Sequence, residues 1–227
     1  GVSDVSTSSA RPDVDAVRSW LTQSRLRNQV RREVVGLDRL SGWQINEDSI
    51  HPVGASEHPA AAFDVIHVQA RCSSREVAEW DQPLIETRGQ GLVALIAQRR
   101  HGTLRVLLRA AMEPGHFDSV ECTATVDCIP QNLRTDAQRA AQPFLERVSG
   151  DCDGLIWSVR QSDEGGRFFR DETDYRLVLL DEDEVIETPA DFKWVTLDQL
   201  FELGAWGNQL TNQLRSIVAW LRLSVES

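Results

Sequence analysis

The sequence is poor in several residues on which common enzyme mechanisms depend. Lysine and tyrosine each occur once, at Lys193 and Tyr175. A Schiff-base mechanism would therefore rest on Lys193 alone. The four cysteines are scattered without a CxxC pair, and no histidine stands at zinc-ligand spacing from Cys122 and Cys128. We therefore expect reduced, packed cysteines rather than a disulfide framework or a metal site.

The signatures of several large enzyme superfamilies are also missing. The sequence contains no GxGxxG, GxxxxGK[ST], GxSxG or HExxH motif. It therefore predicts no dinucleotide-binding, P-loop, α/β-hydrolase or zincin site. The five histidines are dispersed along the chain, so the sequence indicates neither a metal cluster nor a catalytic triad.

Long apolar runs and excess positive charge are absent as well. No segment approaches the roughly 20 apolar residues of a membrane helix, and the first residues lack the apolar stretch of a signal peptide. The net charge of −11 disfavours binding to nucleic acids and to anionic membranes. Since 41% of the residues are hydrophobic and 26% charged, the composition is that of a globular protein. We expect a cytoplasmic protein.

The order of the predicted elements favours an α+β fold. Residues 1–12 are small and polar and predict a disordered leader, and residues 13–227 predict a single module. We expect the following elements: a helix over 13–34; strands at 63–69, 92–96, 104–108 and 119–128; a helix capped by Thr135; strands at 155–159, 166–169 and 175–180; and helices at 198–203 and 210–221. This order predicts a mixed sandwich rather than a doubly wound sheet.

Three segments carry residue types suited to ligand binding or proton transfer. Trp80-Asp81-Gln82-Pro83 offers a ring for base stacking and an amide for hydrogen bonds. Glu113-Pro114-Gly115-His116 places a carboxylate at a predicted strand end, a position suited to acid–base chemistry. In Gln161–Phe168, two glycines permit close approach of a ligand, and Arg167 can grip a diphosphate. An ordinary loop or glycine turn remains an alternative for each segment.

Taken in order, these segments resemble the NDP-hexose 2,3-dehydratase family. Further similar elements lie between and after them, namely Gln90-Gly91, Arg99, Phe192-Lys193-Trp194 and the segment Asn208–Ser216. The resemblance spans roughly Asp13 to Leu223. It implies a Nudix-like fold with mixed β-sheets flanked by helices. The Nudix hydrolase box itself is missing, since Ile129-Pro130-Gln131 stands where its Arg-Glu pair should be, so pyrophosphatase activity is not expected.

The resemblance implies a lyase that removes the C2 hydroxyl of an NDP-4-keto-6-deoxyhexose in deoxysugar or natural-product biosynthesis. The ketone acidifies the C3 proton, so one base and one acid suffice, without a metal or redox cofactor. We expect Glu113 or Glu164 as the base and Tyr175 or His116 as the acid. The expected substrate-binding residues are Trp80, Gln82, Arg99, Gln161, Arg167, Thr125 and Asn132.

The chain also departs from the family pattern. Family members carry two such modules in one chain, whereas this sequence has one, so we expect a homodimer. After Gly115, His116 replaces an asparagine, and Glu121 to Asp127 replaces an amide-rich strand, so that Thr125 and Val126 persist among carboxylates. A non-catalytic or repurposed sugar-nucleotide-binding module, or a partner subunit, is therefore the alternative. An elimination or isomerisation on another carbonyl substrate is a third possibility.

Overall fold

The structure, a computed structural model, describes residues 12–53 and 63–225. Most of the predicted leader lies outside these residues. The described helices are α1 (Asp15–Arg27), α2 (Asp136–Ala140), α3 (Leu145–Val148), α4 (Leu197–Gly204) and α5 (Asn212–Val225), with short 3-10 turns η1 (Leu37–Arg39) and η2 (Pro130–Asn132). The strands are β1 (Trp43–Ile45), β2 (Ser49–Pro52), β3 (Phe63–Arg71), β4 (Glu79–Thr87), β5 (Gly91–Arg100), β6 (Thr103–Met112), β7 (Val120–Thr123), β8 (Val126–Cys128), β9 (Leu155–Ser162), β10 (Glu172–Leu180) and β11 (Phe192–Thr196).

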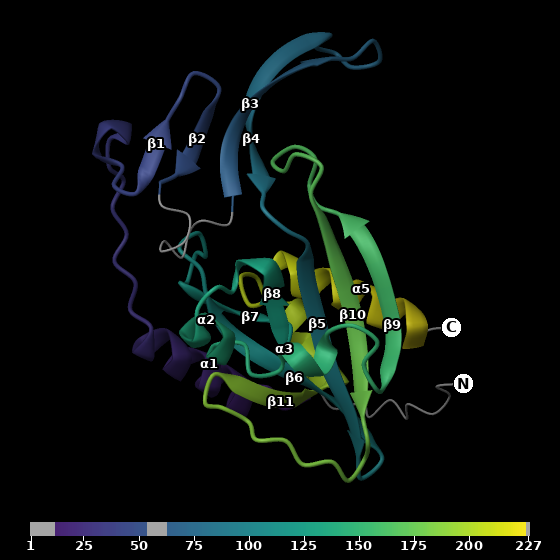
Figure 1. Cartoon of the computed structure of the whole chain (residues 1–227). Helices are drawn as coiled ribbons and strands as arrows, with labels where there is room; N and C mark the ends of the chain where they lie inside the picture. The colour runs from purple at the N-terminus through teal and green to yellow at the C-terminus, as the bar shows by residue number, and fades with distance from the viewer. Residues whose placement is uncertain (1–11, 54–62, 226–227) are drawn as a thin grey trace.

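Two sheets divide the strands between them (Figure 1). A four-stranded antiparallel sheet has the order β1-β2-β3-β4. A seven-stranded mixed sheet has the order β11-β6-β5-β10-β9, with β7 paired to β6 and β8 to β5. The β5–β10 pair is parallel, and the other pairs of this sheet are antiparallel. The α+β architecture is therefore confirmed.

The seven-stranded sheet contains a fork, the point where β5 and β6 separate. The two strands pair directly from Arg100 and Thr103 to Ile96 and Leu107. Beyond the fork, β6 pairs with β7 while β5 pairs with β8. The chain therefore opens into two layers at this end, and β7 and β8 line the space between them.

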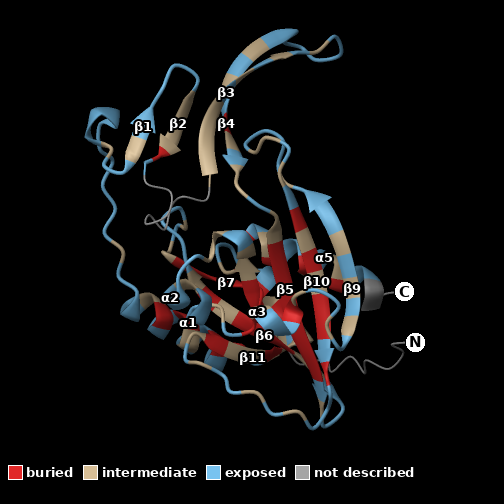
Figure 2. Ribbon diagram, in the orientation of Figure 1, coloured by how far each residue is buried: buried red, intermediate tan, exposed pale blue. Residues whose placement is uncertain are grey.

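Strand β5 is buried on both faces because side chains pack against each of them (Figure 2). Val93 and Leu95 belong to a core cluster that includes residues of α1, α4 and α5, while Leu92 and Ala94 belong to a second cluster with Phe144. A strand covered on both faces reads as a continuous apolar run, as Leu92–Ala97 does. Burial of these apolar surfaces is the main stabilising contribution to this layer.

Backbone hydrogen bonds join the four-stranded sheet to the loop between β9 and β10. The Ile85 amide donates to the Arg167 carbonyl at 2.7 Å, and the Phe169 amide donates to the Ile85 carbonyl at 2.8 Å. Within this sheet the Trp43 and Phe63 rings lie 5.3 Å apart. The far part of the β3–β4 hairpin extends away from the rest of the molecule and is largely exposed (Figures 1 and 2).

Most of the predicted elements exist, and their errors have local causes. The helix predicted over 13–34 ends at Arg27, because the Asn28 side-chain and backbone amides both donate to the Ser24 carbonyl. The helix after Thr135 has the predicted Thr135 cap, but it breaks into α2 and α3 around Pro143. The prediction of a strand at 166–169 is wrong, since this segment forms a turn with one β-bridge, between Phe168 and Ile85.

Candidate functional site

A cavity of about 1270 Å³ lies on the open side of the fork. It is lined by the ends of β6, β7, β8 and β9, by the segment 161–168, which we call the cavity loop, and by the first turn of α5. Phe63, Ile85 and Phe168 contribute an apolar wall beside the four-stranded sheet. The cavity therefore joins residues from nearly every part of the described chain.

The strand register places Asp127 and Tyr175 on the same side of the sheet. Val93 of β5 is the direct partner of Tyr175 on β10 and of Asp127 on β8. Directly opposed residues in neighbouring strands project to the same face. Both side chains line the cavity, on either side of the β5 backbone. A carboxyl group and a phenol thus face one space from two different strands.

Asp127 is a part-buried carboxyl group within a network of charges. The Thr123 hydroxyl donates to its Oδ2 atom at 2.6 Å. Burial raises the pKa of Asp127, the Thr123 hydrogen bond opposes that rise, and the nearby charges act in both directions: Glu113 and Asp163 raise it, while Arg109 lowers it. A carboxyl group with a raised pKa is better suited to proton transfer near neutral pH than an exposed one.

Tyr175 is 6% exposed. Burial, together with the negative charges of Asp163 and Asp127, raises the pKa of its phenol to about 12, although a hydrogen bond with Ser216 lowers it. The hydroxyl therefore stays protonated at neutral pH and is available as a hydrogen-bond donor or as an acid.

Three arginines bring positive charge to the cavity. Arg109 is held by Asp191 at 3.3 Å, by the Gln142 side-chain oxygen at 3.0 Å and by the Phe192 ring below it. Arg167 of the cavity loop pairs with Glu164 at 2.6 Å, and both side chains are 59% exposed. Arg215 bonds to Asn212 in the first turn of α5. Arg109 is therefore anchored in the wall, whereas Arg167 can exchange its partner for a ligand.

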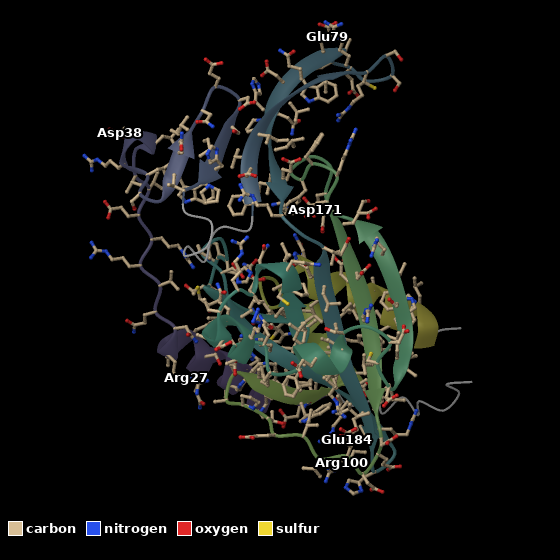
Figure 3. The ribbon with its side chains drawn as sticks, viewed as in Figure 1. Arg27, Asp38, Glu79, Arg100, Asp171 and Glu184 are labelled. Carbon is tan, nitrogen blue, oxygen red and sulfur yellow. The ribbon has the colours of Figure 1, made fainter. Side chains whose placement is uncertain are left out.

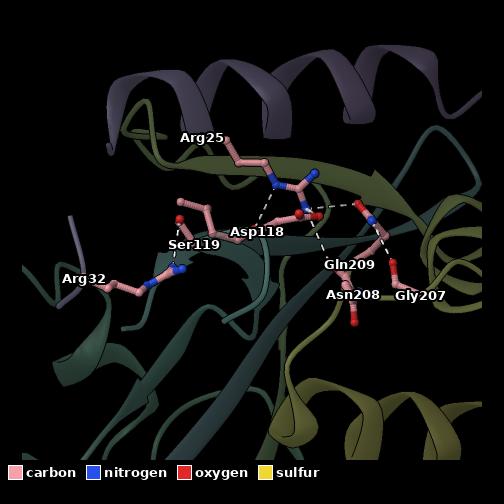
Figure 4. A network of polar contacts seen from close by, with 8 residues as sticks. Arg25, Arg32, Asp118, Ser119, Gly207, Asn208 and Gln209 are labelled. Carbon is pink, nitrogen blue, oxygen red and sulfur yellow. Dashed lines mark hydrogen bonds and ion pairs between the residues drawn. The ribbon is translucent and has the colours of Figure 1, made fainter. Parts of the chain in front are cut away.

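A second polar network holds two of the segments that line the cavity. Arg25 of α1 donates to the Val120 carbonyl at 3.1 Å and the Asn208 carbonyl at 3.3 Å, and its guanidinium lies 3.5 Å from Asp118. Arg32 donates to the Ser119 hydroxyl at 2.9 Å. Figure 4 shows these contacts converging between α1 and the segments around residues 118 and 208. The network thereby positions the entry into β7 and the approach to α5.

Six of the site residues expected from the sequence line this cavity. They are Glu113, His116, Gln161, Glu164, Arg167 and Tyr175. Among the residues that the structure describes, the buried Nδ1 atom of His116 has no hydrogen-bond partner. The turn after β6 and the cavity loop, far apart in sequence, thus meet as expected.

The other five expected residues do not line the cavity. Arg99 lies near the far end of β5, beside Arg100, which Figure 3 shows at the bottom of the view, well away from Asp171. Its side chain donates to the Gly102 carbonyl. Asn132 lies in η2, outside the lining residues. Trp80 and Gln82 lie within β4 rather than before a strand. The Trp80 indole donates to Gln82, whose amide donates to the Gly166 carbonyl at 2.8 Å, so this pair supports the cavity loop from outside.

Thr125 is the fifth of these residues, and its hydroxyl is already occupied. It accepts from the Ile96 amide at 2.9 Å and donates to the Leu107 carbonyl at the fork. Thr125 is 1% exposed. Its placement corresponds to a structural role at the fork, where it satisfies one backbone group of each separating strand.

Several cavity residues were not expected from the sequence. Asp127 appeared there only as a departure from the family pattern, Asp163 and Ser216 lay in segments that were singled out without a role for either residue, and Arg109 gave no local signal. Asp163 accepts from the buried Thr173 hydroxyl at 2.7 Å. The alternation of residues 119–128 was visible, but not the break after Thr123 that turns Asp127 toward the cavity.

The model of the NDP-hexose 2,3-dehydratase family matches residues 14–221. The chain belongs to this family. A dTDP-4-dehydro-6-deoxy-alpha-D-glucopyranose 2,3-dehydratase from Streptomyces violaceoruber is 34% identical over 214 residues, which cover 92% of this chain and 46% of that protein. An enzyme of the same name from Saccharopolyspora spinosa is 34% identical over 203 residues, covering 89% of this chain and 41% of that protein.

This member of the dehydratase family therefore spans less than half the length of the curated relatives it matches. Solved structures are less similar to it. A Nudix hydrolase from M. smegmatis is 17% identical, with a TM-score of 0.37 and coverage of 70% of this chain and 96% of that one. An ADP compounds hydrolase is 13% identical, with a TM-score of 0.43 and coverage of 72% and 86%.

No group of three or more His, Cys, Asp or Glu side chains in residues 12–53 and 63–225 is arranged to hold a metal ion. Within the same part of this dehydratase-family chain, no helix has the length and apolar character to cross a membrane.

Proposed function

We propose that this chain catalyses the 2,3-dehydration of an NDP-4-keto-6-deoxyhexose in deoxysugar biosynthesis. Membership of the dehydratase family and the names of its relatives support this substrate class. The observation that carries the proposal is the pair of Asp127 and Tyr175, which face one large cavity from the two strands that flank β5. A carboxyl group and a protonated phenol provide the two proton-transfer groups that the elimination needs.

In the proposed reaction, Asp127 takes the proton from C3. The electrons of the C3–H bond form the C2=C3 double bond as the C2–O bond breaks, and Tyr175 protonates the departing hydroxyl to give water. The substrate's 4-ketone lowers the barrier by stabilising negative charge at C3. The negative charge of Glu113 raises the pKa of Asp127. Glu164 is paired with Arg167 and exposed, which makes it the weaker candidate for the base.

The same proposal assigns the rest of the substrate to the remaining cavity walls. Arg167 and Arg215 would bind the diphosphate, since arginine pairs with phosphate oxygens in bidentate fashion. Phe63, Ile85 and Phe168 would contact the nucleobase, as aromatic and apolar side chains do in ligand pockets. Gln161 and His116 remain available for hydroxyl groups of the sugar.

Turnover of dTDP-4-keto-6-deoxyglucose, followed by mass spectrometry, tests the assignment. We expect Asp127→Asn and Tyr175→Phe each to lower kcat by at least a hundredfold, the usual scale for loss of a general acid or base, while dTDP binding measured by calorimetry is retained. Arg99→Gln, at the far end of β5, is the matched control and should leave kcat unchanged. Binding without any turnover in the parent chain would contradict the proposal and select the non-catalytic alternative.

The assembly and location are part of the same proposal. Two copies of this chain would recreate the paired modules implied by the family pattern, and the homodimer would act in the cytoplasm. The four cysteines are free in the structure, in keeping with a reducing compartment. Light scattering at several concentrations tests the dimer, and a monomer at all of them would contradict it.

A further inference from the structure

A continuous chain of hydrogen bonds runs from the start of α5 to Asp127. The Leu214 amide donates to the Thr211 hydroxyl at 3.3 Å, and the Thr211 and Thr123 hydroxyls lie 3.1 Å apart. The Thr123 hydroxyl then donates to Asp127 Oδ2 at 2.6 Å. Thr123 is 1% exposed and Thr211 is 5% exposed, so both residues are largely shielded from solvent although they line the cavity.

The direction of this chain follows from its two ends. The Leu214 amide can only donate, so it occupies an acceptor position on the Thr211 oxygen and leaves that hydroxyl's proton for Thr123. A carboxylate can only accept, so Thr123 in turn must direct its proton toward Asp127. Both threonines are therefore oriented the same way whenever Asp127 is ionised. Hydrogen bonds aligned in this manner polarise one another and are strengthened.

The backbone holds the two threonines beside one another. The Cys122 amide donates to the Gln209 carbonyl at 2.8 Å, and the Thr211 amide donates to the Cys122 carbonyl at 2.9 Å. The segment before α5 thus lies along the free edge of β7. Because the amides at a helix start carry partial positive charge, the chain of hydroxyls links that charge to the carboxylate.

We propose that Thr211 and Thr123 form a positioning relay that holds the Asp127 carboxylate ionised and fixes its orientation for proton abstraction. This inference rests on the proposed function, in which Asp127 is the base. The relay occupies Oδ2 and fixes the plane of the carboxyl group, which leaves Oδ1 for the substrate. Neither threonine is assigned a contact with the reacting atoms, so both are positioning residues.

The charged groups that face Asp127 shift its pKa in opposite directions. Arg109 on β6 favours the carboxylate, whereas Glu113 after β6 and Asp163 after β9 disfavour it. Tyr175 on β10 is neutral at the relevant pH, and burial raises the pKa of the adjacent Cys128 thiol to about 12, so it is neutral too. Since the relay also favours the carboxylate, its removal must raise the pKa of Asp127.

The pH dependence of kcat/KM in Thr123→Val tests the relay. The base must be deprotonated, so activity increases with pH through the Asp127 pKa. We expect the acid limb of the profile to move to higher pH, with kcat/KM on that limb reduced about tenfold, which corresponds to about 1.4 kcal/mol. Thr123→Ser restores the hydroxyl and should restore the parent profile. A reduced rate with an unshifted limb, or a Ser variant that behaves like Val, would overturn the relay.

Two further measurements separate the relay from the proposed function. Thr211→Val also removes the cap of α5, so Thr211→Ser, which keeps the hydroxyl, is its control. If Thr211→Val is folded, the acid limb of its profile should move in the same direction as that of Thr123→Val. If Asp127→Asn is inactive while the Thr123→Val profile is unshifted, the relay fails and the function stands. If the parent chain has no turnover, the function fails, and carbon NMR titration of Asp127 still tests the relay. An unchanged Asp127 pKa in Thr123→Val would then refute it.

Discussion

Thr125 lies at the point where β5 and β6 separate, and its hydroxyl bridges the backbones of the two strands. It accepts from the Ile96 amide and donates to the Leu107 carbonyl, and these two residues form the last direct pair of β5 and β6 before the fork. A buried backbone group without a partner costs about 1–3 kcal/mol. One side chain therefore makes the fork, and with it the cavity, compatible with a well-bonded backbone.

Thr125→Val keeps the shape of this side chain and removes both hydrogen bonds. We expect the free energy of unfolding to fall by about 2–4 kcal/mol, because two buried backbone groups lose their partner. Urea denaturation followed by circular dichroism measures the loss. Thr125→Ser retains the hydroxyl and should lose less than half as much. If the variant instead unfolds normally but binds dTDP more weakly, Thr125 has the ligand-binding role expected from the sequence.

Strands β5, β6 and β10 are tied together at the end opposite the cavity by the Gln98 side chain. Gln98 is 0% exposed; its amide nitrogen donates to the Asp181 and Glu184 carbonyls, each at 2.7 Å, and its oxygen accepts from Arg105 at 2.6 Å. The backbone carbonyls of the acidic turn after β10 provide the partners that allow an amide to be buried here.

Gln98→Leu should therefore weaken the junction of these three strands. Two carbonyls and one guanidinium lose a partner, so we expect the free energy of unfolding to fall by about 2–4 kcal/mol. The measurement is again urea denaturation. Gln44→Leu on β1 is the matched control, because that side chain is exposed and such changes stay within about 0.5 kcal/mol. An equal effect of the two substitutions would show that burial of Gln98 has little energetic importance.

The molecule as a whole carries a net charge of −11, yet the proposed ligand is an anion. Binding then depends on where individual arginines lie rather than on the overall charge. Arg167 lies in the cavity loop, whereas Arg99 lies at the other end of β5. Substitution of each arginine in turn separates the effect of charge at the cavity on binding from the effect of the overall charge.

We expect Arg167→Ala to weaken dTDP binding at least tenfold, or about 1.4 kcal/mol, and Arg99→Ala to leave it unchanged. Calorimetric titration measures both affinities. The increase in thermal stability produced by saturating dTDP should shrink for Arg167→Ala in the same way. Equal weakening by the two substitutions would mean that overall charge, and not the cavity loop, governs binding.

Elements with strong local signals were predictable. The hairpin of β5 and β6 follows from two apolar runs around His101-Gly102, and both turn residues have positive φ angles, as such a short turn requires. Thr135 caps its helix as predicted, and the structure adds Gln138, which completes a capping box. Strand β4 was not among the predicted strands; it contains Pro83, which is tolerated because β4 is an edge strand.

The sequence by itself determined the α+β class, most strands and helices, and the family, because periodicity, capping and motif order are local or linear properties. It also identified six residues of the cavity. Only the tertiary structure decided that Asp127 faces Tyr175, that Thr125 serves the fork, and that Thr211 reaches Thr123 across 88 residues of chain. These relations depend on strand register and on the break between β7 and β8. Both arise from long-range pairing, which no local pattern encodes.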